Sequence, residues 1–246
     1  MSGHRFYLTP ENFSANTAVI SGDESHHLRK VLRLRIGDEV QVFDGLGRQW
    51  LATIEQFNGQ NVNLTLQKSI TISVESPLSI TLIQGLIKGD RFDWVIQKAV
   101  ELGVSKIQPL ISQYTDFQGV KGVEKRLERW ERIALEATKQ SGRNVLTTIC
   151  PPIEWSGLVK ELKLPVIFFA EREGNPLSKV IKQLKEQQIN SITVIVGSEG
   201  GWGNEELFQA AKAGFYLTTL GKRILRAETA GITSVALIQY LLGDLD

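Results

Sequence analysis

The chain has 246 residues, with 42% hydrophobic and 22% charged residues, which excludes a disordered or collagen-like protein. Its formal net charge of +1 excludes a protein that binds polyanions simply by being basic overall, but a local basic patch stays open. The single cysteine, Cys150, excludes a disulfide framework and a multi-cysteine zinc site. The three histidines all lie near the N-terminus, so we predict no metal site.

We expect no membrane span, because no apolar run approaches the roughly 18 residues that a transmembrane helix needs. The first residues, MSGHRFYLTPENF, contain no apolar segment of the kind that a secretory signal carries. Together with the low cysteine content, this favours a protein of the reducing cytoplasm.

The N-terminal third of the chain is β-like. Strand-length runs with partial alternation occupy residues 41–44, 48–57 and 61–68, separated by Gly and Asn turns. One helix is predicted over 26–33, where apolar residues repeat at positions i, i+3 and i+4. These features predict a small β-barrel-like domain over residues 1–72.

After a short linker around residues 73–77, the pattern changes to alternating strands and helices, which predicts a parallel sheet covered on both faces. This second domain spans residues 76–246. Strands are predicted over 79–86, 106–111, 165–170, 191–196 and 216–220. Helices are predicted over 92–102, 124–141, 177–187, 204–213 and 228–242, with Asn204 as the N-cap of the fourth.

Ligands of parallel α/β sheets bind beyond the carboxyl ends of the strands, and two segments there are unusual. The first, residues 197–203, reads GSEGGWG. Its four glycines let backbone approach a ligand closely, although a flexible connecting loop is the alternative. The segment matches neither a dinucleotide-binding fingerprint nor a Walker loop.

The second segment, residues 220–230, reads LGKRILRAETA and opens the last helix. Helix capping explains Glu228 and Thr229, and leaves the arginines as surface residues. It does not explain the apolar pair Ile224 and Leu225 inside the basic run. Just beyond, Gly231 costs roughly 1 kcal/mol relative to Ala in mid-helix, which predicts a close packing partner.

These segments, GSEGGW and then LGKRILRAETA, resemble the signature of RsmE-type 16S rRNA (uracil-N3) methyltransferases of the SPOUT (α/β-knot) class. Further blocks agree in order and spacing, so the resemblance covers nearly the whole chain: HHLRKVLRLRIGDEVQVFDG, KGDRFDWVIQKAVELGV and ERIALEATKQSGR. Two positions depart from the family pattern. Ser198 stands where Pro is usual, and Gly203 where Ser is frequent.

The resemblance implies a PUA-like RNA-binding barrel followed by a trefoil-knotted SPOUT methyltransferase domain with a parallel sheet. In the knot, the 220–230 segment passes behind the 197–203 loop. It further implies S-adenosylmethionine as methyl donor, a homodimer, and 16S rRNA of the small ribosomal subunit as substrate, methylated to 3-methyluridine. Two alternatives stay open: a non-catalytic RNA-binding or ribosome-assembly module, and a knotted methyltransferase that acts on another RNA.

The implied cofactor site uses glycine backbone to hold the adenine and apolar side chains as walls around the adenosine. For each glycine, turn geometry alone is the alternative. The implied cofactor-binding residues are Ala170, Glu171, Gly197, Glu199, Gly200, Gly201, Leu220, Gly221, Ile224, Leu225 and Thr229.

Methylation at N3 of uracil requires removal of a weakly acidic proton or stabilisation of the resulting anion. We expect Arg226 to donate to a uracil oxygen and Glu228 to take the proton, directly or through a water. The alternative for Glu228 is a helix-start acid paired with Arg226.

RNA binding needs cations and stacking groups. A solvated helix face is the alternative for the four cations between residues 29 and 35, and a capping or partly buried histidine is the alternative for His27. The candidate residues are His27, Arg29, Lys30, Arg33, Arg35, Lys88, Arg91, Gln140 and Arg143. Among the tryptophans, we place Trp94 and Trp130 in the core or dimer interface, and Trp202 over the cofactor or the target base.

Overall fold

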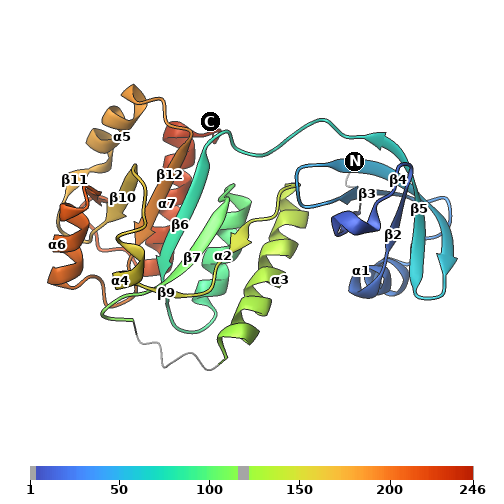
Figure 1. Cartoon of the computed structure of the whole chain (residues 1–246), viewed down its shortest axis with the longest axis horizontal. Helices are drawn as coiled ribbons and strands as arrows, with labels where there is room; N and C mark the ends of the chain where they lie inside the picture. Colours follow the sequence, from blue (N-terminus) through green and yellow to red (C-terminus); the bar gives the residue numbers. More distant parts are fainter. Residues whose placement is uncertain (1–3, 116–121, 246) are drawn as a thin grey trace. The chain divides into compact units, whose positions relative to one another are not determined.

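The computed structural model describes residues 4–115 and 122–245, which group into two compact units (Figure 1). The N-terminal unit consists of the chain up to Glu75 together with Thr138–Leu146. The C-terminal unit consists of Ser76–Ala137 and the chain from Thr147 onward. In the described part of the chain, no helix is long and apolar enough to cross a membrane.

The N-terminal unit is built on a five-stranded sheet with the order β1-β3-β4-β5-β2. Its strands are β1 (Arg5–Tyr7), β2 (Thr17–Ile20), β3 (Glu39–Phe43), β4 (Gln49–Asn58) and β5 (Asn61–Ser69). All pairings are antiparallel except that of β1 with β3. The three predicted strands are confirmed. The sequence reading missed β1 and β2, because runs of three and four residues are too short to show alternation.

The predicted helix over residues 26–33 is wrong in position and in type. The chain forms α1 (Gly22–His26) followed by a turn of π-helix, η2 (His27–Val31). Leu28 is fully buried, whereas Val31 is 61% exposed and Arg33 lies beyond the helix with a φ of 56°. Arg29 and Arg33 therefore do not share the face of one regular helix.

Residues 138–146 belong to the N-terminal unit through a buried ion pair. The Arg143 guanidinium lies 2.8 Å from Glu75 Oε2, and its side chain is only 4% exposed. The other carboxylate oxygen of Glu75 accepts hydrogen bonds from the backbone N–H groups of Asn144 and Val145. Arg143 is thus a structural cation, contrary to its predicted place on an RNA-binding surface.

The C-terminal unit contains an eight-stranded sheet with the order β11-β13-β10-β12-β6-β7-β8, in which β9 also pairs with β7. Every pairing is parallel, as predicted. The strands are β6 (Ser79–Gly85), β7 (Lys106–Ile111), β8 (Thr148–Ile149), β9 (Ile153–Glu154), β10 (Val166–Phe169), β11 (Asn175–Pro176), β12 (Ser191–Val196) and β13 (Tyr216–Thr219).

Helices cover both faces of this sheet. One face packs against α2 (Arg91–Glu101), α3 (Val123–Ser141), α5 (Leu177–Glu186) and α7 (Ala227–Leu242), and the other against α4 (Trp155–Leu158) and α6 (Asn204–Lys212). Side chains alternate along β12, so that both faces of the sheet are apolar. Val194 and Val196 lie in the first core, between the sheet and α2, α3, α5 and α7, and Ile195 lies in the second core, between the sheet and α4 and α6. Predicted helix bounds differ by only one or two residues. The N-cap of α6 is Gly203, one residue before the predicted Asn204.

Close packing of α7 on the sheet confirms the expectation drawn from Gly231. A Cβ at this position would overlap Oε1 of Gln84, a fully buried side chain in β6. The same strand ends at Gly85, where a Cβ would overlap the backbone of Gly197 and Ser198. Small residues therefore let both α7 and the loop after β12 lie directly against the end of β6.

Candidate active site

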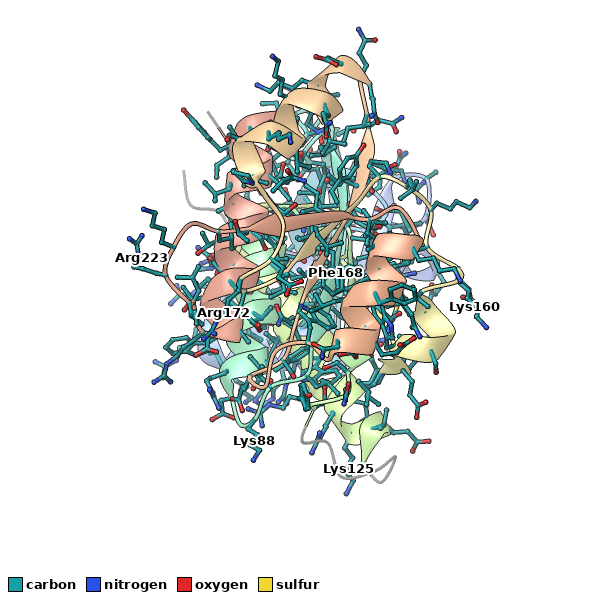
Figure 2. All side chains as sticks on the ribbon, turned by 90° about the vertical axis from the view of Figure 1, so that its left-hand side faces the viewer. Lys88, Lys125, Lys160, Phe168, Arg172 and Arg223 are labelled. Carbon is teal, nitrogen blue, oxygen red and sulfur yellow. The ribbon has the colours of Figure 1, made fainter. Side chains whose placement is uncertain are left out.

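A pocket of about 440 Å³ lies beyond the carboxyl ends of β10, β12 and β13. Its wall comes from four segments: residues 169–171, residues 196–199, residues 220–230 and the start of α2 at Arg91. The two segments singled out in the sequence are thus brought together, as we expected for a parallel sheet. The volume falls within the range of small-molecule sites. Figure 2 shows Arg223, which lines this pocket, pointing outward.

The loop after β12 is held to the sheet by residues of β6 and by its own tryptophan. Nε2 of the buried Gln84 donates a hydrogen bond of 3.1 Å to the carbonyl oxygen of Gly197. A Cβ on Gly197 would lie 3.1 Å from the Trp202 ring. Sequence reasoning missed Gln84, whose position at the end of a buried strand is the only local signal.

The other glycines of the site are explained by protein neighbours or by turn geometry. A Cβ on Gly200 would lie 2.5 Å from Tyr114 Cβ, and one on Gly201, whose φ is 70°, would overlap the Glu171 carboxylate. Gly221 has a φ of 83° and open space around it. Of these three glycines, none lines the described pocket, and neither does the exposed Thr229.

We expected Trp202 to cover the cofactor or the target base. It is instead buried in the second core. Its indole stacks on Phe168 with ring centroids 4.3 Å apart and contacts Trp155. Its Nε1 donates a hydrogen bond of 2.9 Å to the carbonyl oxygen of Phe169. Trp130 is buried as expected, whereas Trp94 is 65% exposed.

Seven of the predicted cofactor residues do line the pocket. They are Ala170, Glu171, Gly197, Glu199, Leu220, Ile224 and Leu225. Six lining residues that the sequence reading did not assign are Phe169, Val196, Ser198, Arg223, Ala227 and Ala230. Phe169 and Val196 are the last residues of their strands, and Ser198 lies two residues further on, a signal that was present in the sequence.

The charged groups of the pocket are balanced: Arg91, Arg223 and Arg226 face Glu171, Glu199 and Glu228. Arg91 forms an ion pair with Glu199, and its Nη1 lies 4.0 Å from Glu228 Oε2. The cation nearest to Glu228 is therefore Arg91, which comes from α2, and not the Arg226 suggested by the sequence. Arg226 is exposed at the N-cap of α7, with its backbone extended.

The predicted RNA-binding residues fall into both units. In the N-terminal unit, His27, Lys30, Arg33 and Arg35 are exposed, as is Gln140. Arg29 is half-buried. Its guanidinium donates a hydrogen bond of 2.5 Å to the carbonyl oxygen of Gly59 and lies 5.2 Å from the Phe57 ring centroid. In the C-terminal unit, Lys88 is exposed and points outward in Figure 2, whereas Arg91 lines the pocket.

Within residues 4–115 and 122–245, the structure contains no group of three or more His, Cys, Asp or Glu side chains that could hold a metal ion.

Family comparisons agree with this architecture. The model of an RNA methyltransferase domain matches residues 74–239, and that of an RNA methyltransferase PUA domain matches residues 20–67. Fold, pocket and matches together define an RNA methyltransferase with a PUA domain.

Similar proteins narrow this class. Ribosomal RNA small subunit methyltransferase E of Buchnera aphidicola (subsp. Acyrthosiphon pisum) is 32% identical over 98% of this chain and 94% of its own length. The enzyme of the same name from Synechocystis is 33% identical over 97% of this chain and 78% of its own. This chain belongs to the family of ribosomal RNA small subunit methyltransferase E.

Two solved structures share the fold over essentially their whole length. Ribosomal RNA small subunit methyltransferase E from Neisseria gonorrhoeae, bound to S-adenosyl methionine, is 36% identical with a TM-score of 0.89, covering 99% of this chain and 100% of that one. A Legionella pneumophila methyltransferase, also with bound cofactor, is 29% identical with a TM-score of 0.90 and full coverage of both chains.

Proposed function

We propose that this protein transfers a methyl group from S-adenosylmethionine to N3 of a specific uridine in 16S rRNA, giving 3-methyluridine. The observation that carries the proposal is the pocket itself, where the loop after β12 meets the start of α7. Its relatives of the same family are named for methylation of small-subunit rRNA, and two structural neighbours hold the methyl donor.

The residues of the pocket suit S-adenosylmethionine. Apolar side chains of Phe169, Leu220 and Leu225 offer walls for the adenosine, and the backbone of Gly197 offers polar groups without a side chain in the way. The carboxylates of Glu171, Glu199 and Glu228 attract a cationic sulfonium, and the three arginines of the pocket limit this attraction. When bound, the cofactor supplies the electrophilic methyl group.

We assign direct cofactor contact to the seven pocket-lining residues named above. Gly200, Gly201, Gly221 and Thr229 complete the predicted set as residues that shape the neighbouring loops and the helix start. Arg226 and Glu228 are the proposed catalytic residues. As N3 attacks the methyl carbon, the C–S bond breaks with its electron pair on sulfur, and the N3 proton passes to Glu228. Arg226 donates to a uracil oxygen, where negative charge develops.

The substrate RNA is proposed to contact both units. In the N-terminal unit, exposed cations bind phosphates and Gln140 adds a polar contact, and in the C-terminal unit Lys88 binds phosphate. The contacting residues of the N-terminal unit are His27, Arg29, Lys30, Arg33 and Arg35. Arg29 serves partly as structure, because Gly59 and Phe57 fix its guanidinium. We also propose that residues 1–72 form a PUA-like RNA-binding domain and that residues 76–246 form the methyltransferase domain.

We further propose a trefoil knot around the pocket, a homodimer and a cytoplasmic location where small subunits assemble. An apolar groove beside α7, lined by Leu177, Leu225 and Leu237, supports the homodimer, as does the exposed Tyr240. The concentration dependence of the sedimentation coefficient tests the dimer: a monomer at all concentrations would contradict it.

The decisive experiment is methyl transfer from isotope-labelled S-adenosylmethionine to small subunits from cells that lack this protein. After digestion, mass spectrometry identifies the labelled nucleoside. Labelled 3-methyluridine supports the proposal. Label in another nucleoside contradicts the assigned reaction and favours a methyltransferase of different specificity. Absence of label, with cofactor binding measured separately, contradicts catalysis on this substrate and favours the RNA-binding assembly role.

A further inference from the structure

The pocket contains a buried acceptor atom that no described group satisfies. Glu228 Oε2 is inaccessible to solvent and has no hydrogen-bond partner among the residues that the structure describes. The whole side chain is 13% exposed and lines the pocket. Buried polar atoms are nearly always hydrogen-bonded, and those that are not call for an explanation. In a ligand pocket, the simplest explanation is that a turn of the Glu228 side chain brings this oxygen to a ligand N–H when the site is filled.

The guanidinium of Arg91 lies close to two carboxylates from different segments, those of Glu199 and Glu228. Arg91 is the first residue of α2, and its Nε donates to the carbonyl oxygen of Lys88 at 3.3 Å. Nη2 pairs with Glu199, whereas Nη1 stops 4.0 Å from Glu228 Oε2. This distance leaves charge attraction but no hydrogen bond, so Arg91 does not use the acceptor position that a ligand N–H would need.

We propose that Arg91 is a positioning residue for methyl transfer, which holds Glu228 in the orientation in which Oε2 accepts the N3–H of uracil. The inference rests on the proposed function. It also explains a preference for uracil, because N3 of neutral cytosine carries a lone pair and no proton. A carboxylate would repel that lone pair, as a site built to bind a donor rejects a base that lacks one.

The other charged groups of the pocket do not replace Arg91. Glu171 and Glu199 repel the Glu228 carboxylate, and the second of these is paired with Arg91 itself. Arg223 and Arg226 attract it, but both are exposed to solvent, which screens their charge. Removal of Arg91 therefore leaves both Glu228 and Glu199 without their nearby cation.

The test compares Arg91→Gln, Arg91→Lys and Glu228→Gln with the wild type. Arg91→Gln should lower kcat about tenfold or more, with little change in the KM for RNA. The acidic limb of the rate profile should move to higher pH, because loss of a nearby cation raises the pKa of a carboxyl group. Arg91→Lys should restore most of the rate, and Glu228→Gln should abolish the limb.

Arg129→Gln is the matched control. Arg129 also pairs with two carboxylates at the start of α2, those of Asp90 and Asp93, but outside the pocket lining. The hydrogen bond to Asp93 raises the pKa of the Arg129 guanidinium, so this side chain is charged. Arg129→Gln therefore removes one positive charge, as Arg91→Gln does. Arg91 is merely structural if both variants lose rate in proportion to their loss of thermal stability and the acidic limb of the pH–rate profile does not move. A raised KM at unchanged kcat would make it a phosphate contact. Either result overturns the inference.

A second readout does not depend on turnover. Carbon-13 NMR of labelled glutamate carboxyls, assigned with Glu228→Gln, gives the pKa of Glu228 in the cofactor-bound protein. This pKa should rise in Arg91→Gln and stay unchanged in Arg129→Gln. An unchanged pKa in Arg91→Gln overturns the inference. An inactive wild type with the expected pKa rise would instead count against the proposed substrate alone.

Discussion

The indole Nε1 of Trp202 donates a hydrogen bond of 2.9 Å to the backbone carbonyl oxygen of Phe169. This bond joins the loop after β12 to the last residue of β10, and Phe169 and the loop residues 197–199 line the same pocket. Trp202 belongs to a hydrophobic core of the C-terminal unit, so the pocket wall is held in place from the protein interior.

Replacing Trp202 with Phe keeps the stacking surface but removes the donor. We expect a loss of about 1–3 kcal/mol in the free energy of unfolding, the usual cost of a buried acceptor left unsatisfied. Cofactor affinity should fall as well, because the loop loses its tie to β10. Chemical denaturation and calorimetric titration measure the two effects. Trp94→Phe, at an exposed position, should change stability by no more than about 0.5 kcal/mol.

Replacing Gly231 with Ala tests the close approach of α7 to β6. Helix propensity alone would make this change stabilising by about 1 kcal/mol. The overlap with Gln84 should reverse the sign and destabilise the protein by about 1–3 kcal/mol, the cost of overpacking. In the double variant with Gln84→Ala, the two effects should not add. Strict additivity would show that Gln84 is not the reason for the glycine.

Replacing Arg226 with Ala should leave cofactor affinity nearly intact and reduce turnover about tenfold or more, the scale for loss of a transition-state donor. Single-turnover methyl transfer and calorimetric titration separate the two quantities. Lys160→Ala serves as control, because Lys160 lines a different groove between α4 and α6. Unchanged turnover in Arg226→Ala would remove this residue from the mechanism.

Replacing Arg143 with Met should destabilise the protein without weakening the electrostatic component of RNA binding. Breaking the buried pair with Glu75 should cost about 3 kcal/mol. At a temperature where the variant is folded, the dependence of RNA affinity on salt should equal that of the wild type. A shallower dependence would show that Arg143 does contact phosphate.

Replacing Lys30 with Ala should give the opposite pattern. This exposed residue of η2 should contribute little to stability, and its loss should reduce the slope of log affinity against log salt by about one. Filter binding over a salt series measures the slope. An unchanged slope would place the RNA on another face of the N-terminal unit.

The sequence by itself determined the type and order of the longer elements in the C-terminal unit and two of the segments that form the pocket, whereas β8, β9, β11 and α4, each of two to four residues, were not predicted. Helix and strand periodicities are local, and carboxyl ends of parallel strands must lie at one edge, so residues 197–203 and 220–230 could be brought together without coordinates. The assignment to a family of RNA methyltransferases rested on motifs in these same segments.

Only the tertiary structure decided which residues face the pocket and which face the protein. Gly200 is required by Tyr114, Trp202 belongs to a core, Arg143 is buried with Glu75, and Arg91 is the cation beside Glu228. Each of these contacts joins positions far apart in the chain. Local pattern carries no information about such neighbours, because they are set by how helices and loops pack on the sheet.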